Sequence, residues 1–193
     1  MAETFHIIER SAHAGTPRAR ASRRRPDDPG LPQLACLLDP ARVADALPWR
    51  ALGLRPAAIA DIGIELLRHE PRRRATVRCT LVGRDGRPVR VVYGKTFCDD
   101  RAHELHARFE YFARRGRGAA LHVATPLGWC AAMRTFWQAE APGVPLAERL
   151  LALPPAPAAV RLRSVARALA QLHAAPAEMA SAAEPRLLAH GVR

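Results

Sequence analysis

The single lysine is the residue whose type points most directly to chemistry. Lys95 is the only lysine among the 30 basic residues, and every other one is arginine. An ammonium group is a compact charge on a flexible stem, whereas a guanidinium is a planar fork. In a chain that otherwise uses arginine, a lone lysine indicates a site that needs a localised positive charge. The alternative is an ordinary exposed lysine on a strand, whose stem covers apolar surface.

Other residues that could bind a metal or act as nucleophiles are poorly spaced. The four cysteines are Cys36, Cys79, Cys98 and Cys130. They form no C-x-x-C pair, so we expect reduced, partly buried thiols rather than a zinc or redox site. His103 and His106 lie three residues apart, whereas H-E-x-x-H places its histidines four apart. We therefore expect them on a solvated helix face, and we expect His173 to be a packing histidine near a helix end.

The net charge of +12 suggests nucleic-acid binding, but its distribution favours another interpretation. Much of the excess lies in Arg18–Arg25, within a stretch, 11–30, that has no apolar periodicity. Such a run is typical of a solvated tail, so we expect residues 1–30 to be a disordered, Arg-rich segment. No segment approaches the ~20 apolar residues of a membrane helix. The first ten residues lack the apolar core of a signal peptide, so we expect a cytoplasmic protein without membrane contact.

Three strands are predicted around Lys95. Alternating apolar residues predict a strand at 61–68. Two further runs, 75–83 and 88–97, flank Asp85-Gly86, a dipeptide typical of a tight β-hairpin. Lys95 therefore falls near the end of the third strand.

Helices are predicted on both sides of these strands. Asp39 as N-cap and Pro40 at the first helical position predict a short helix to Leu47. Asp99 or Asp100 should cap a second helix, which runs to about Arg115. Apolar residues of this second helix lie at helical spacing and should pack on the sheet: Ala102, Leu105, Phe109 and Phe112.

The remainder of the chain predicts two short strands and then helices. The strands are expected at 121–125 and 133–139, and the helices at 146–153 and 158–174. In the last helix we expect four residues to face inward: Val160, Val165, Leu169 and Leu172. The expected fold class is α+β.

This order of elements, with four sequence pieces, resembles the N-terminal part of the aminoglycoside phosphotransferase-like family, which has a protein-kinase-like fold. The pieces are RHEPRRRATVRCTL, VVYGKTF, FWQAEAPGVPLAERL and ARALAQLHA, within residues 60–175. The resemblance implies a small lobe at 31–141, made of a five-stranded antiparallel sheet and one helix. It implies the first helices of a large lobe at 142–193.

The same resemblance implies ATP and Mg²⁺ as cofactors. Lys95 matches the lysine that contacts the α- and β-phosphates of ATP, and a glutamate on the next helix holds that lysine. Either Glu104 or Glu110 fills this role, and Glu110 is favoured because its separation from Lys95 is usual in kinases. Adenine would meet backbone groups of a connecting segment: Gln138, Ala139, Glu140 and Ala141.

Two departures from the family limit this interpretation. HEPRRR replaces the glycine-rich phosphate loop, so Arg72, Arg73 and Arg74 either lie over the phosphates or are solvated. At the family's catalytic aspartate, the run His190–Arg193 carries Val192. We therefore expect a truncated enzyme, without the catalytic aspartate or the magnesium ligands, whose ATP affinity is weak or absent.

Two other classes of function stay open. A pseudokinase-like module would bind nucleotide and partners without catalysis. A basic nucleic-acid-binding protein would bind DNA or RNA through residues 1–30 in a salt-sensitive manner. The acceptor is expected to be an unknown small molecule, because specificity in this fold lies in the large lobe.

Overall fold

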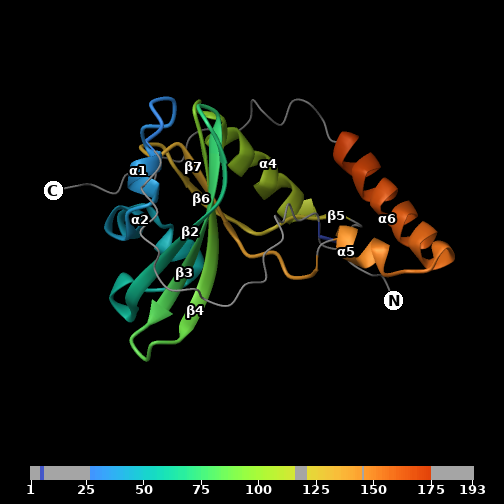
Figure 1. Cartoon of the computed structure of the whole chain (residues 1–193), viewed down its shortest axis with the longest axis horizontal. Helices are drawn as coiled ribbons and strands as arrows, with labels where there is room; N and C mark the ends of the chain where they lie inside the picture. The colour runs from blue at the N-terminus through green and yellow to red at the C-terminus, as the bar shows by residue number, and fades with distance from the viewer. Residues whose placement is uncertain (1–4, 7–26, 116–120, 145, 175–193) are drawn as a thin grey trace.

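The computed structural model describes residues 5–6, 27–115, 121–144 and 146–174. The chain is an α+β protein built on a five-stranded antiparallel sheet with helices on both faces (Figure 1). The strands of this sheet are β2 (Ile59–Glu70), β3 (Arg74–Gly83), β4 (Pro88–Phe97), β6 (Pro126–Cys130) and β7 (Thr135–Ala139). They lie in the order β2-β3-β4-β7-β6, so β7 inserts between β4 and the edge strand β6.

The three strands predicted around Lys95 are confirmed, and the hairpin signal places the turn correctly. Gly86 adopts a φ of 75°, which a residue with a side chain rarely tolerates. The Gly83 N–H donates to the Arg87 carbonyl at 2.9 Å, and the Asp85 carboxylate accepts from the Arg87 N–H at 3.1 Å. Asp-Gly at the tip therefore fixes the register of β3 against β4.

Short helices from the N-terminal region cover one face of the sheet. They are α1 (Leu34–Leu37), α2 (Pro40–Ala46) and α3 (Trp49–Leu52), followed by a 3-10 turn at Pro56–Ala58. The predicted helix at 40–47 is confirmed as α2, since the Asp39 carboxylate accepts from the Ala41 N–H at 2.9 Å. The core on this face consists of Leu37, Val43, Leu47, Leu52, Ile62, Val77, Cys79, Leu81, Val92, Met133 and Trp137.

The helix α4 (Arg101–Arg115) covers part of the opposite face (Figure 1). Ala102 is buried, and Leu105 and Phe109 pack with Phe97 and Phe136 from the sheet, as the helical spacing predicts. The Phe109 and Phe136 ring centroids lie 4.9 Å apart. Much of this face, beyond α4, carries polar residues.

The prediction of a sheet strand at 121–125 is wrong in its position. The sheet strand is β6, and β5 (Leu121–His122) instead pairs in parallel with β1 (Phe5–His6). Disorder of residues 1–30 is also wrong for Phe5–His6 and for Asp28, which is buried. Both outcomes depend on partners distant in sequence, which local composition does not reveal. Residues 1–4 and 7–26 lie outside the described residues.

The two helices predicted late in the chain form, but the face of the last helix that was predicted to be buried is mostly exposed. They are α5 (Leu146–Leu151) and α6 (Pro155–His173). On α6, Val160, Leu169 and Leu172 are exposed, Val165 is half-buried as expected, and Ala168 is buried. Among the described elements, α6 packs chiefly against the two-residue strands β5 and β1, which offer little surface to bury larger side chains. His173 is likewise exposed rather than packed, and His190–Arg193 lie outside the described residues.

None of the helices within the described residues combines the length and hydrophobicity needed to cross a membrane.

Candidate functional site

Lys95 lies on the sheet face opposite the N-terminal helices. It pairs in register with Thr76 on β3 and with Phe136 on β7. Its neighbour Gly94 pairs with Val77 and Trp137, which are buried under the N-terminal helices. Because successive strand residues point to opposite faces, Lys95 points to the face that α4 only partly covers.

A cleft of about 550 Å³ opens on this face beside Lys95. Its walls come from the ends of β2, β3 and β4, from the β4–α4 connection and from the first turns of α4. The lining residues are Arg68, Arg74, Ala75, Thr76, Lys95, Phe97, Asp99, Asp100, Arg101, Glu104, Leu105 and Arg108. This volume is within the usual range of small-molecule sites.

Positive charge predominates in the cleft. Arginines and Lys95 outnumber the three carboxylates among its lining residues, Asp99, Asp100 and Glu104. Arginine and lysine side chains gathered in a concave site favour a ligand with several anionic oxygens.

Ion pairs already orient several of the guanidinium groups. The Arg74 guanidinium donates from two nitrogens to the two Glu70 oxygens, each at 2.9 Å. Hydrogen bonding from Arg74 holds the pKa of the Glu70 carboxyl below its usual range. Arg101 forms a similar pair with Asp99, at 2.6 Å for the shorter contact, and lowers the pKa of that carboxyl. These pairs keep the arginines in fixed directions at the cleft.

The structure brings Glu104, rather than the favoured Glu110, to the cleft that Lys95 lines. Glu104 lies in the first turn of α4 and lines the cleft, and its carboxylate is 3.7 Å from Arg108. Glu110 does not line the cleft, and it pairs with Arg114 at 2.9 Å. The two glutamates project about 120° apart around the helix axis, because each residue advances about 100°. The cleft lining therefore favours Glu104 over Glu110 as the partner of Lys95, and the choice between them stays a prediction.

The three arginines of the β2–β3 turn differ in their placement. Arg74 lines the cleft, whereas the Arg73 side chain is 80% exposed and lies 4.0 Å from Glu70. Arg72 has a φ of 61°, and its N–H donates to the Asp28 carboxylate at 2.9 Å. Of the two predicted site residues here, the structure thus places Arg74 in the cleft and Arg73 outside its lining.

The predicted adenine segment begins at the end of β7, on the strand next to Lys95. Gln138 pairs in register with Tyr93. Tyr93 lies two residues before Lys95 on β4 and therefore on the same face of the sheet. The Ala139 N–H donates to the Thr125 carbonyl at 2.9 Å, so it is engaged within the protein. The Glu140 carboxylate accepts from the Tyr93 hydroxyl at 3.1 Å, and Ala141 follows as a half-buried residue. Burial and the nearby Glu140 charge raise the pKa of Tyr93.

Several cleft residues were not predicted from the sequence. Tyr93 does not line the cleft but shares its face of the sheet, and it was detectable because strand alternation places residues two apart on one face. Arg68, Arg101 and Arg108 carried no local signal, since the approach of β2 and α4 to Lys95 is a long-range property. Charge alone does not separate them from other arginines of this chain.

Metal binding has no candidate among the residues that the structure describes, where no group of three or more His, Cys, Asp or Glu side chains could hold an ion. His103 and His106 are half-buried, so the expected solvated face is wrong. The His103 ring centroid lies 4.9 Å from that of Trp129, and the His106 ring centroid lies 6.2 Å from that of Phe136. Burial lowers the pKa of His106.

Comparison of the chain with protein families, with curated proteins and with solved structures finds no match.

Proposed function

We propose that the described region binds ATP, as the nucleotide-binding part of a phosphotransferase that acts on a hydroxyl group of a small molecule. The observation that carries this proposal is the placement of the only lysine. Lys95 lines a cationic cleft at the end of the third sheet strand, and the helix that follows this strand supplies Glu104 to the same cleft. A strand lysine and a helix glutamate at one phosphate site are the arrangement that the kinase resemblance implies.

The size and charge of the cleft support a nucleotide ligand. Lys95 would donate to phosphate oxygens, and Arg74 and Arg101, held by Glu70 and Asp99, would add fixed charge-assisted donors. Glu104 would orient the Lys95 ammonium group. ATP, when bound, supplies the phosphoryl group that a phosphotransferase transfers.

The base would lie along the strands towards residues 138–141. Tyr93 is on the Lys95 face of β4, and its hydroxyl is hydrogen-bonded to Glu140. An aromatic ring beside the phosphate site suits a planar base, because bases stack on aromatic side chains. The described residues contain no cluster of three or more side chains that could bind Mg²⁺, so no step is assigned to this ion.

Calorimetric titration of the full chain tests this proposal. The ligands are ATP and inorganic tripolyphosphate, and the variants are Lys95→Ala, Lys95→Arg and, as control, Arg87→Ala in the exposed hairpin. Lys95→Ala should weaken both ligands about tenfold or more, since a hydrogen bond to a charged group contributes roughly 1.5–3 kcal/mol. Lys95→Arg should recover only part of the affinity, because a planar fork replaces a point charge.

Binding that Lys95→Ala and Arg87→Ala reduce equally would contradict a site at Lys95. A wild-type chain that binds neither ligand would overturn the proposal.

A further inference from the structure

Asp28 is a buried carboxylate that binds the β2–β3 turn from a distant part of the sequence. Its side chain is 3% exposed. One oxygen accepts from the Gly30 N–H at 2.9 Å; the other accepts from the Arg72 N–H at 2.9 Å and lies 2.8 Å from His69 Nε2. The Arg72 N–H, and next the His69 ring, hold the pKa of Asp28 below its usual range. The carboxylate is therefore ionised at neutral pH, and both of its oxygens have hydrogen-bond partners.

The backbone at Arg72 needs such support. Its φ of 61° lies in the left-handed region, which residues with a side chain avoid unless their surroundings impose it. Gly30 lies against this turn so closely that a Cβ at position 30 would be 2.6 Å from the Arg72 Cα. The segment 28–30 is thus shaped to the turn, through one carboxylate and one missing side chain.

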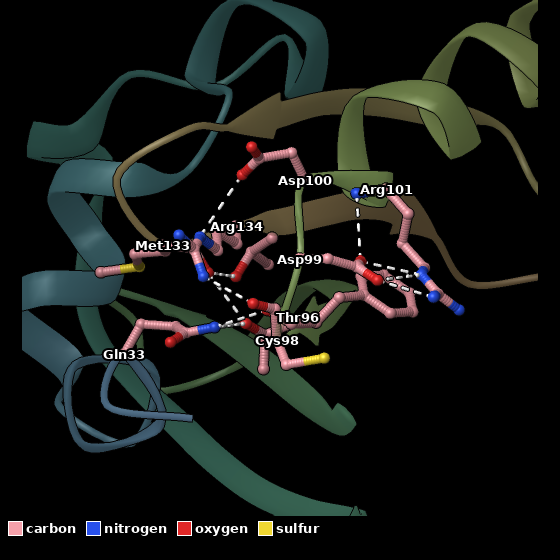
Figure 2. Close-up of polar contacts among 10 residues, drawn as sticks. Gln33, Thr96, Cys98, Asp99, Asp100, Arg101, Met133 and Arg134 are labelled. Carbon is pink, nitrogen blue, oxygen red and sulfur yellow. Dashed lines mark hydrogen bonds and ion pairs between the residues drawn. The ribbon is translucent and has the colours of Figure 1, made fainter. Parts of the chain in front are cut away.

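A few residues further along the chain, Gln33 forms hydrogen bonds with the end of β4, on the other side of the cleft. The Gln33 amide donates to the Thr96 hydroxyl at 3.0 Å and to the Phe97 carbonyl at 2.7 Å, both buried (Figure 2). Phe97 lines the cleft and is followed by the connection to α4. The Thr96 hydroxyl in turn donates to the Met133 carbonyl at 2.8 Å, before β7.

A direct bond joins the two walls at the same place. The Cys98 N–H donates to the Arg73 carbonyl at 3.0 Å. The start of β3 and the end of β4 are paired in the sheet, Arg74 with Phe97, so the ladder sets their spacing. The Cys98–Arg73 bond extends this pairing into the turn, and residues 28–33 add contacts through the Asp28 and Gln33 side chains.

We propose that residues 28–33 form a strap that fixes the β2–β3 turn beside the paired ends of β3 and β4, and that Asp28 is a positioning residue for phosphate binding. This inference rests on the proposed function. With the turn fixed, Arg74 is presented to the ligand without further ordering of the backbone, and less of the binding free energy is spent on that ordering. Asp28 itself does not line the cleft, so it acts through the turn.

The first test is whether Asp28 holds the turn. In Asp28→Asn an amide NH2 replaces one acceptor oxygen and faces either the Gly30 N–H or the Arg72 N–H, so one of these two backbone donors loses its acceptor. We expect tryptic cleavage after Arg72 and Arg73, followed by mass spectrometry well below the melting temperature, to become at least fivefold faster. The matched control is Asp39→Ala, which removes the side-chain cap of α2 in the same part of the chain.

The second test measures what the turn does for the ligand. Asp28→Asn should weaken tripolyphosphate binding about threefold to tenfold and leave adenosine binding unchanged, because adenosine lacks the phosphates. Asp39→Ala should lower the melting temperature without changing either affinity. Gly30→Ala forces the turn to move without changing a charge, so it should behave like Asp28→Asn and replaces it if that variant does not fold.

Each result bears on the inference. Faster cleavage at the turn with weaker tripolyphosphate binding, in the position-28 or position-30 variant alone, supports the strap. Unchanged cleavage, or equal effects in Asp39→Ala, overturns it. Wild-type binding that Asp28→Asn leaves unchanged overturns the positioning role alone, whereas a wild-type chain without tripolyphosphate binding overturns the proposed function and this inference with it.

Discussion

The two faces of the five-stranded sheet are built from the same strands but from different kinds of residue. On the face under the N-terminal helices, alternate positions of β3, β4 and β7 are fully buried and mostly apolar: Val77, Cys79, Leu81, Val92 and Trp137. The intervening positions, on the face towards α4, include Thr76, Arg78, Tyr93 and Lys95, which are only partly covered.

This contrast separates stability from chemistry within single strands. Burying a large apolar side chain contributes roughly 1.5–3 kcal/mol, so the covered face carries the packing. The open face leaves polar groups at fixed spacing above a rigid sheet, which suits ligand binding. Substitutions on the covered face should therefore change folding, and those on the open face should change binding.

The largest effect is expected from Trp137→Ala on the covered face. Trp137 is fully buried, and its ring occupies the space that a side chain at Gly94 would take, 2.6 Å from an added Cβ. Removing it should lower the free energy of unfolding by about 3–5 kcal/mol, from lost burial and a cavity. Urea unfolding monitored by circular dichroism measures this. A loss below about 1 kcal/mol would contradict the central place of Trp137 in the core.

The reactivity of the thiols tests the covered face in a second way. Burial raises the pKa of Cys79 from 9.0 to about 12, so its thiolate fraction at pH 8 should fall about thousandfold. A thiol reagent should label the exposed Cys36 in the native chain and leave Cys79 unmodified until the chain unfolds. Peptide mass spectrometry distinguishes the two sites. Equal labelling of both in the native chain would show that this face is open.

On the open face, the two glutamates of α4 give a matched comparison. Glu104→Gln should weaken ATP binding about fivefold, because Glu104 lines the cleft with Lys95. Glu110→Gln removes a surface pair with Arg114, which contributes about 0.2–0.5 kcal/mol to the helix, and should not change ATP affinity. Titration of both variants decides between them. A loss of ATP affinity in the Glu110 variant alone would show that Glu110, rather than Glu104, is the glutamate that orients Lys95.

The smallest effect concerns pH. Burial lowers the folded-state pKa of His106 below its ordinary 6.5, so the unfolded chain binds more protons than the folded chain in this range. The stability that neutral His106 contributes is present above pH 6.5 and is lost as the pH falls through the lowered value. Urea unfolding at pH 7.5 and pH 5 should show a decrease, which His106→Leu reduces. An identical pH dependence in the variant would exclude His106 as its source.

Local signals in the sequence were sufficient for the elements around Lys95. The Asp85-Gly86 turn and the alternation on either side predicted β3 and β4, and helical spacing predicted the packing of Ala102, Leu105 and Phe109 on the sheet, though not the place of Phe112 outside that cluster. These features depend on neighbours within a few residues, where turn chemistry and periodicity act.

The parts of the site that depend on distant partners were not predictable in this way. Asp28 reaches Arg72 across 44 positions, and Gln33 reaches Thr96 across 63, so neither carries a local pattern. The choice between Glu104 and Glu110 depends on the rotation of α4 against the sheet, which packing of Phe109 against Phe136 fixes. Composition suggested disorder before Leu31, yet long-range hydrogen bonds order the chain from Asp28.

Chemical labelling of Lys95 is the most direct test of the site. Because the chain has one lysine, its only other primary amine is the N-terminal α-amine, which serves as an internal control. An ATP analogue that carries an amine-reactive acyl phosphate should acylate Lys95, and excess ATP should suppress this modification while leaving the N-terminal amine unaffected. Equal labelling of both amines, insensitive to ATP, would contradict a nucleotide site at Lys95.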